Sequence, residues 1–76
     1  MRMYRFLVVI EKAEGNCSAY SPDLPGCVAT GKTRDQAAQN MHEAIEMHVL
    51  GLLEDELPVP ESHSFAEYVA VATQGS

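Results

Sequence analysis

The first thirty residues contain three short apolar runs, spaced like the strands of a small sheet. Residues 3–11 are rich in β-branched and aromatic side chains and are apolar on both faces in the middle, which is typical of a strand covered on two sides. The run Glu14-Gly15-Asn16 provides turn chemistry, because glycine and asparagine tolerate a positive φ. We therefore predict a hairpin of strands at about residues 3–11 and 17–21, followed by a third strand at about 27–31.

The periodicity changes to that of a helix after Thr33. Thr33 and Gln36 have the spacing of a capping box, in which the threonine hydroxyl accepts from the Gln36 amide and the glutamine side chain returns to the Thr33 amide. Apolar side chains then recur every three or four positions, so we predict an amphipathic helix at about residues 34–55. The face expected to meet the sheet consists of Ala37, Ala38, Met41, Ile45, His48, Val49 and Leu52.

Two prolines, Pro58 and Pro60, end the helix and begin an extended connector. Residues 65–72 predict a fourth strand, and residues 73–76 a short tail. The order β-β-β-α-β predicts one α+β domain over residues 1–76: an antiparallel three-stranded meander, a fourth strand returning beside the first, and one helix packed on one face. The uncovered face of the sheet is partly apolar, so we expect it to meet another subunit or a partner.

The composition describes a small acidic domain. Five lysines and arginines stand against eleven aspartates and glutamates in 76 residues, for a net charge of −6. This balance disfavours direct binding to nucleic acid or to an anionic membrane surface, and it suits a basic partner. No apolar run approaches the ~18 residues of a membrane span. We expect a cytoplasmic protein that self-associates as a dimer or higher oligomer, because so short a chain builds only a modest core.

The cysteines and histidines do not suggest a reactive or metal-binding centre. Cys17 and Cys27 can form at most one disulfide, and we expect both to be reduced within strands. No metal-ligand spacing joins them to His42, His48 or His63, and His48 is interpreted as a histidine at the edge of the core or in an interface. A Cys27–His63 nucleophilic pair lacks an activating motif. We therefore expect no catalytic residues, metal or cofactor.

One segment matches the sequence pattern of a phosphate-binding loop. Residues 26–33, Gly-Cys-Val-Ala-Thr-Gly-Lys-Thr, satisfy the pattern G-x-x-x-x-G-K-[ST]. Such a loop needs a buried strand immediately before its first glycine, whereas this chain has Pro25 there and places its strand inside the variable stretch. The context therefore argues against nucleotide binding.

The carboxylates allow a second alternative, a two-metal nuclease. Glu11, Asp23, Asp35 and Glu43 would have to converge on metal ions ~4 Å apart. Asp35 already has a simpler role, since a carboxylate in the first helical turn complements the helix dipole. A residual metal-dependent nuclease using Glu11, Asp23 or Glu43 is the less favoured interpretation.

Taken together, the motifs resemble the HicB-like antitoxin family over roughly residues 4–60. The segment between the second and third strands carries the most specific part of the resemblance, and Pro25-Gly26 within it matches the centre of a type II turn. The residues that form this motif are Pro22, Asp23, Leu24, Pro25, Gly26 and Cys27, with Gly31 and Thr33 at a fixed distance. In the predicted helix, the residues that carry the resemblance are Ala37, Asn40, Glu43 and Ala44.

The resemblance implies a partial, degraded ribonuclease H-like fold without its catalytic carboxylates. It implies an antitoxin that binds a small, basic, mRNA-cleaving HicA-like toxin and masks its active site, in agreement with the acidic charge. Longer family members carry a C-terminal helix-turn-helix or ribbon-helix-helix that binds the operator. This sequence reaches Ser76 without either, so the resemblance does not imply autoregulation at the operator, and the expectation of no direct nucleic-acid binding rests on the charge.

The sequence thus favours a non-enzymatic, protein-binding domain. Glu43, Glu46 and Glu54 lie on the outer helix face and are the candidates for contacting lysines and arginines of the toxin, although exposed charges of this kind often contribute little. The alternative in the same family is a stand-alone HicB-like oligomer that binds another protein, or a small molecule on its uncovered sheet face.

Overall fold

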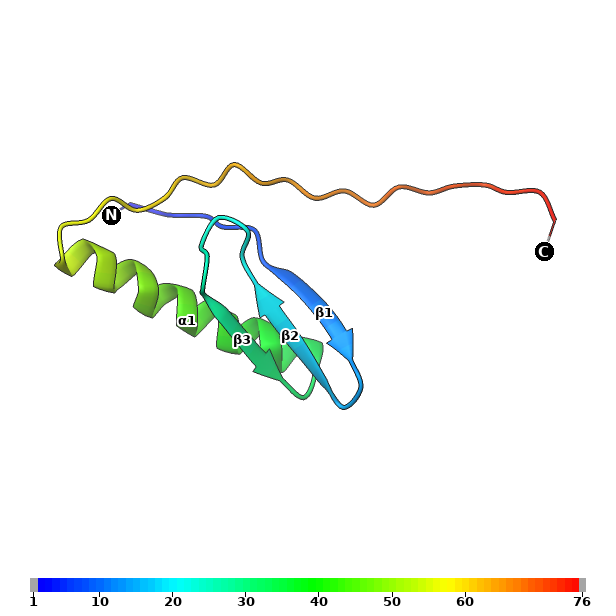
Figure 1. Ribbon diagram of the computed structural model, residues 1–76, viewed down its shortest axis with the longest axis horizontal. Helices are drawn as coiled ribbons and strands as arrows, with labels where there is room; N and C mark the ends of the chain where they lie inside the picture. Colours follow the sequence, from blue (N-terminus) through cyan, green and yellow to red (C-terminus); the bar gives the residue numbers. More distant parts are fainter. Residues whose placement is uncertain (1, 76) are drawn as a thin grey trace.

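Three antiparallel strands followed by one helix form the body of the protein in the computed structural model, which describes residues 2–75 (Figure 1). The elements are β1 (Val9–Ala13), β2 (Asn16–Tyr20), β3 (Val28–Gly31) and α1 (Arg34–Glu54). The sheet order is β1-β2-β3, so strands that are consecutive in sequence pair with each other. The α+β class and the three-stranded meander are confirmed.

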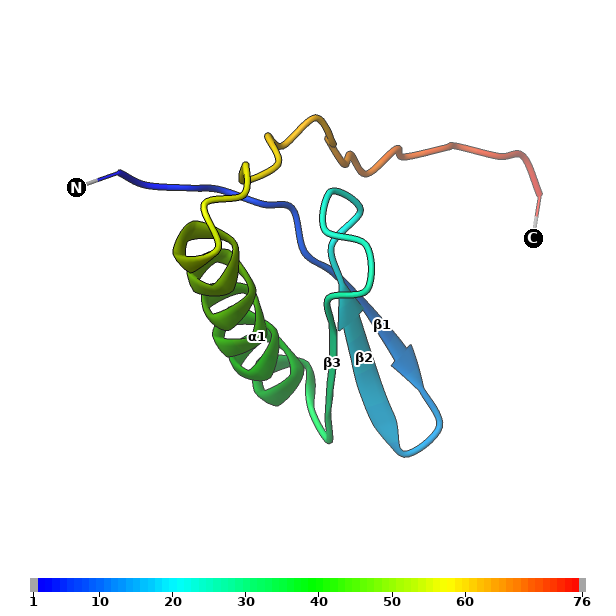
Figure 2. The same cartoon turned by 60° about the vertical axis from the view of Figure 1, so that its left-hand side comes forward.

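The register of the sheet gathers apolar side chains on the face that meets the helix. Ile10 of β1 lies opposite Ala19 of β2, which in turn lies opposite Ala29 of β3. Ala19 is buried, and the other two pack against the core. The opposite face carries the row Val9, Tyr20 and Val28, and no element covers it among the described residues (Figure 2).

The helix starts as the sequence predicts, although only half of the capping box forms. The backbone amide of Gln36 donates to the Thr33 hydroxyl at 3.1 Å, which caps the first turn. The Gln36 side chain does not return to the Thr33 amide but donates to Oδ1 of Asn40 at 3.0 Å. Asn40 offers this oxygen because its own amide group donates to the carbonyl oxygen of Thr30 at 2.7 Å.

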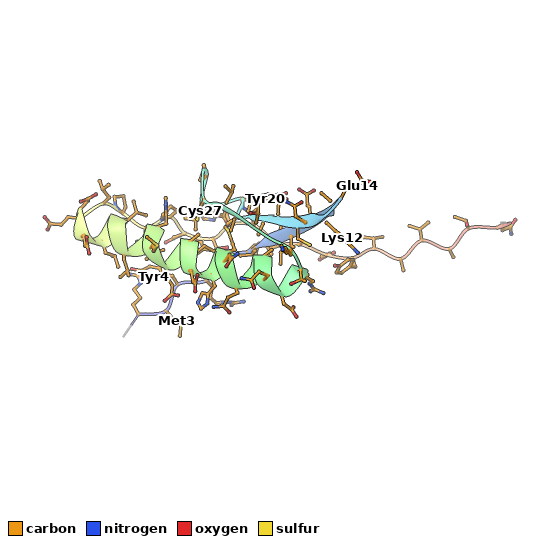
Figure 3. The ribbon with its side chains drawn as sticks, turned by 90° about the horizontal axis from the view of Figure 1, so that it is seen from below. Met3, Tyr4, Lys12, Glu14, Tyr20 and Cys27 are labelled. Carbon is orange, nitrogen blue, oxygen red and sulfur yellow. The ribbon has the colours of Figure 1, made fainter. Side chains whose placement is uncertain are left out.

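The core lies between the sheet and the first half of the helix, and Figure 3 shows these two layers, with Glu14 at the tip of the β1–β2 hairpin. The buried residues of this hydrophobic cluster are Cys17, Ala19, Leu24, Cys27, Ala37 and Met41. Val49 is also buried farther along the helix. The expectation that Ala38 and His48 face the core is wrong, because both side chains are exposed. His48 belongs to the second half of α1, and this half extends beyond the strands (Figure 1).

Two predicted strand boundaries also change. β1 starts at Val9 and not near residue 3, because its partner strand ends at Tyr20, which lies opposite Val9. Residues 2–8, here called the N-terminal segment, continue in an extended form without a strand partner. Cys27 lies one residue before β3 and not within it, because it closes the turn that precedes the strand.

The fourth strand predicted at residues 65–72 is absent from the described structure. Residues 57–75, here called the C-terminal arm, run as an extended chain along one side of the molecule (Figure 1). The radius of gyration is 15.6 Å, whereas a compact chain of this length has about 11 Å. An apolar, β-branched and aromatic stretch indicates a strand but does not specify its partner, and among the described residues no strand edge pairs with the arm.

Candidate functional site

The proline-rich loop between β2 and β3 consists of two consecutive tight turns. The amide of Leu24 donates to the carbonyl oxygen of Ser21, and the amide of Cys27 donates to that of Leu24, each at 3.1 Å. Gly26 adopts φ +84°, as the third position of a type II turn requires, so the predicted turn at Pro25-Gly26 is confirmed. The two turns bury the Leu24 side chain completely.

Asp23 connects this loop to the C-terminal arm. Its Oδ2 accepts hydrogen bonds from the Ser62 hydroxyl at 3.1 Å and the His63 amide at 3.3 Å, and its Oδ1 accepts one from the Ser64 hydroxyl at 3.1 Å. These contacts, here called the Asp23 tether, join residues about forty positions apart. The carboxylate that the sequence motif singles out therefore holds the base of the arm against the body of the protein.

The hydrogen bonds also determine the ionisation of Asp23. Desolvation favours the neutral acid and acts to raise the pKa of Asp23. The hydrogen bonds from the amide of His63 and from Ser64 and Ser62 favour the carboxylate, and together they lower the pKa of Asp23 below its ordinary value. The tether therefore operates with a charged acceptor at neutral pH.

Gly31 and Thr33 shape the junction where β3 meets the helix. A Cβ atom at Gly31 would overlap the backbone of Gln36 and Ala37, with only 2.8 Å to the carbonyl carbon of Gln36. Only glycine permits this close approach. With the Thr33 cap and the bond from Asn40 to Thr30, the junction fixes the helix against the sheet.

This arrangement also accounts for the resemblance to a phosphate-binding loop. β3 (Val28–Gly31) takes up most of the variable stretch of that pattern and its second glycine, and Thr33 is the cap of the helix. The backbone amides of a strand cannot wrap around a phosphate as a glycine-rich loop does. The residues that match the pattern therefore form a turn, a strand and a helix cap.

The cysteines and histidines do not assemble into a reactive centre. Cys17 and Cys27 are both free thiols and both are buried. Burial raises the pKa of the Cys27 thiol, which opposes formation of the thiolate. His63 lies exposed on the arm, whereas Cys27 is part of the core. Within residues 2–75, no three metal-ligating side chains come together.

The four carboxylates of the nuclease interpretation are distributed over different elements. Glu11 is exposed on β1, Asp35 and Glu43 are exposed on the helix, and Asp23 is engaged by the serines of the arm. In the described part of the chain they form no cluster of the kind that holds two metal ions.

The outer face of α1 combines negative charges with exposed apolar side chains. Glu43, Glu46 and Glu54, the three predicted contact residues, are all exposed and share one face of the helix. Met47 and Leu50 lie between them on that face and are 75% and 58% exposed. These five residues are here called the helix outer patch. Glu46 also lies 3.8 Å from His42, between carboxylate oxygen and imidazole nitrogen.

The sequence interpretation selected the glutamates of this patch but missed its apolar centre. The sequence contains the signal for this apolar centre, because Met47 and Leu50 are three positions apart within the polar face of the helix. A charged rim around exposed apolar side chains is typical of a protein–protein contact surface.

No helix among residues 2–75 combines the length and the apolarity that a membrane crossing requires.

Comparisons with known proteins agree with the resemblance seen in the sequence. Residues 6–74 match the family described as the HicB-like antitoxin of a bacterial toxin-antitoxin system. The chain is similar to an uncharacterised 14.9 kDa protein of Haemophilus phage HP1, at 37% identity over 82% of this chain, and to a UPF0150 protein of Synechocystis, at 38% identity over 79%.

A solved structure, titled the HicA3 and HicB3 toxin-antitoxin complex, contains a similar chain with a TM-score of 0.57 and 28% identity over 71% of this chain. The present chain spans 47% of the phage relative, 77% of the Synechocystis relative and 66% of the matched chain in that complex.

Proposed function

Because this chain belongs to the HicB-like antitoxin family, we propose that it acts as an antitoxin by binding a small, basic, HicA-like RNA-cleaving toxin. The observation that carries the proposal is the likeness, at a TM-score of 0.57, to a chain of a solved toxin–antitoxin complex. In this role the protein binds and masks its partner, and no catalytic step of its own is needed.

The charge of the chain supports a basic partner. A protein that cleaves RNA must hold a polyanion and does so chiefly with lysine and arginine. An acidic protein with a net charge of −6 attracts such a partner over long range, and its association slows as salt is added.

The helix outer patch is the surface that we assign to the toxin. Met47 and Leu50 provide apolar area at its centre, and Glu43, Glu46 and Glu54 provide acceptors at its rim. Exposed ion pairs alone are worth only about 0–1 kcal/mol. The apolar centre is therefore the part that can supply affinity, while the glutamates direct the approach and orientation of the toxin.

Co-purification tests the proposal. The chain is co-expressed with the product of the adjacent reading frame, which the proposal requires to be a small basic protein, and the complex is isolated through a tag on that product. We expect a stable complex whose association rate falls as salt increases, together with loss of the partner's RNA cleavage. Failure to form any complex at low salt would contradict the antitoxin proposal.

Two charge-matched variants test the surface separately. Glu43→Lys, Glu46→Lys and Glu54→Lys are combined in one chain, and Glu11→Lys, Glu14→Lys and Glu61→Lys in the control. Both change the net charge by the same amount. We expect the first variant to weaken toxin binding at least tenfold more than the control. Equal loss in both would reject the helix outer patch as the contact surface while leaving the antitoxin role intact.

A further inference from the structure

The N-terminal half of β1, with the segment before it, and the C-terminal arm form the two walls of an open slot. One space of about 480 Å³ is lined by residues 7–10 and 66–68, together with Arg34. A second, of about 420 Å³, is lined by residues 5–8 on one wall and by Ser62 and residues 64–66 on the other. Because the residue numbers increase in step along both walls, the two walls run in the same direction (Figure 1).

Both walls have the properties of strands that lack a neighbour. Among the described residues, those at 5–8 and 65–72 take part in no backbone hydrogen bond. The arm also exposes large apolar side chains, with Phe65 at 93% and Val69 at 78%. Apolar residues fall on both faces of this stretch, as in a strand covered on two sides.

We propose that the slot receives the arm of a second copy of this chain, so that two copies exchange their arms reciprocally. Neighbouring strands lie about 4.8 Å apart, so two walls separated by one inserted strand can both form hydrogen bonds to it. The result is one continuous sheet across both copies. Its strands follow in this order: β1 of the first copy, the arm of the partner, the arm of the first copy, and β1 of the partner.

The directions of the strands fit this arrangement. A two-fold axis between the two arms makes them antiparallel to each other. Since each arm runs parallel to its own β1, the partner's arm then runs antiparallel to both walls of the slot. Every new pairing is therefore antiparallel, like the pairings of β1 with β2 and of β2 with β3.

The Asp23 tether favours a second copy over closure within one chain. The tether holds Ser62, His63 and Ser64 at the base of the arm and so keeps the arm away from its own β1. Closure within the chain would also produce a parallel pair beside an antiparallel meander. This inference concerns self-association and does not depend on the antitoxin role.

The test combines a mass measurement with backbone hydrogen exchange on the full chain without any partner. We expect light scattering to give twice 8.3 kDa, or 16.6 kDa, at about 100 µM protein. We also expect slow exchange of the amides at 5–8 and 65–72, which a lone chain leaves unpaired. A monomer with protected arm amides would mean closure within the chain, and a dimer with unprotected arm amides would mean a different interface. Either result would overturn the proposal. A monomer in which the amides at 5–8 and 65–72 exchange rapidly would also overturn it.

A proline substitution in the arm tests whether the arm forms a strand of the dimer. Val69→Pro removes an amide and is incompatible with an interior strand, yet Val69 is largely exposed in the single chain. We expect the dimer dissociation constant to rise by about tenfold or more, with the helical circular dichroism unchanged. Val69→Thr, which keeps a β-branched side chain and its amide, should remain dimeric. Equal dimerisation of the two variants would contradict arm exchange.

Discussion

The carboxylate of Asp23 accepts a hydrogen bond from the hydroxyl of Ser64 at 3.1 Å, although the two residues lie 41 positions apart in the chain. The aspartate belongs to a tight turn before β3, and the serine belongs to the arm that follows the helix. A short loop motif thereby determines the path of a segment at the opposite end of the sequence, and this relationship can be tested directly.

Replacing Asp23 with asparagine should release the arm. The neutral amide accepts more weakly than a carboxylate and has only one acceptor oxygen, so the bonds from Ser62, Ser64 and the His63 amide cannot all persist. We expect faster hydrogen exchange at the His63 amide and faster proteolysis around residues 57–64. Asp35→Asn, an equal charge change on the exposed helix start, should leave both rates unchanged.

Acid should loosen the same contact. The pKa of Asp23 in the folded protein is lowered, so the carboxylate stabilises the tethered form fully above the ordinary carboxyl pKa of about 4. That contribution is lost as the pH falls through the lowered folded value. We expect the amide resonances of His63 and Ser64 to titrate below pH 4, and not in Asp23→Asn. A midpoint at or above the ordinary value would contradict a charged tether.

Gly31→Ala should destabilise the protein by about 1–3 kcal/mol, because the new methyl group meets backbone atoms of Gln36 and Ala37 that cannot rotate away. Gly51→Ala is the matched control. Gly51 lies within α1 and has nothing within 4 Å of the position of a Cβ, so alanine there should stabilise the helix by about 0.5–1 kcal/mol. Urea denaturation measures both changes, and the prediction fails unless their signs are opposite.

Glu56 ends the helix in a conformation that glycine prefers. It has φ +55°, its amide donates to the carbonyl oxygen of Leu53, and the amide of Leu57 donates to that of Leu52. Glu56→Gly should therefore raise the free energy of unfolding by about 0.5–1 kcal/mol. Glu54→Gly, two residues earlier and still helical, should lower it. A loss of stability in both variants would contradict a left-handed helix end.

The buried thiols should be slow to react. Cys27 is only 6% exposed, and burial raises its pKa, so little thiolate is available to an alkylating reagent at pH 8. We expect both cysteines to react with iodoacetamide at a rate limited by unfolding, and to react fully in urea. A cysteine added by Gln39→Cys, at an exposed position of the helix, serves for comparison, and a native thiol that reacts equally fast would be inconsistent with this core.

Local features of the chain were predictable because their causes are local. The type II turn at Pro25-Gly26, the Thr33 cap and the helix bounds all depend on residues within a few positions of one another. The second half of the capping box was not predictable, because Asn40 competes for the Gln36 side chain and is held by Thr30 of β3. That competition exists only after the helix has packed on the sheet.

The long-range features were less accessible from the sequence. The pattern at residues 65–72 is that of a strand, but its partner depends on which edge is within reach, and the Asp23 tether decides that. His48 has helical spacing for the core, yet it is exposed in the second half of α1, the half that extends beyond the strands (Figure 1). The slot could not be predicted from periodicity, because its two walls lie more than fifty positions apart in the sequence.

The separation between the body and the arm has a consequence for folding kinetics. Among residues 2–75, every buried hydrophobic side chain lies between Cys17 and Val49, and the elements that bury these side chains are neighbours in sequence. Such a low contact order favours rapid folding of the body in a first-order phase that is independent of protein concentration. The proposed pairing of two arms is a second-order encounter. Refolding should therefore show a fast phase reported by the helix, followed by a phase that accelerates with concentration and leaves the helix signal unchanged.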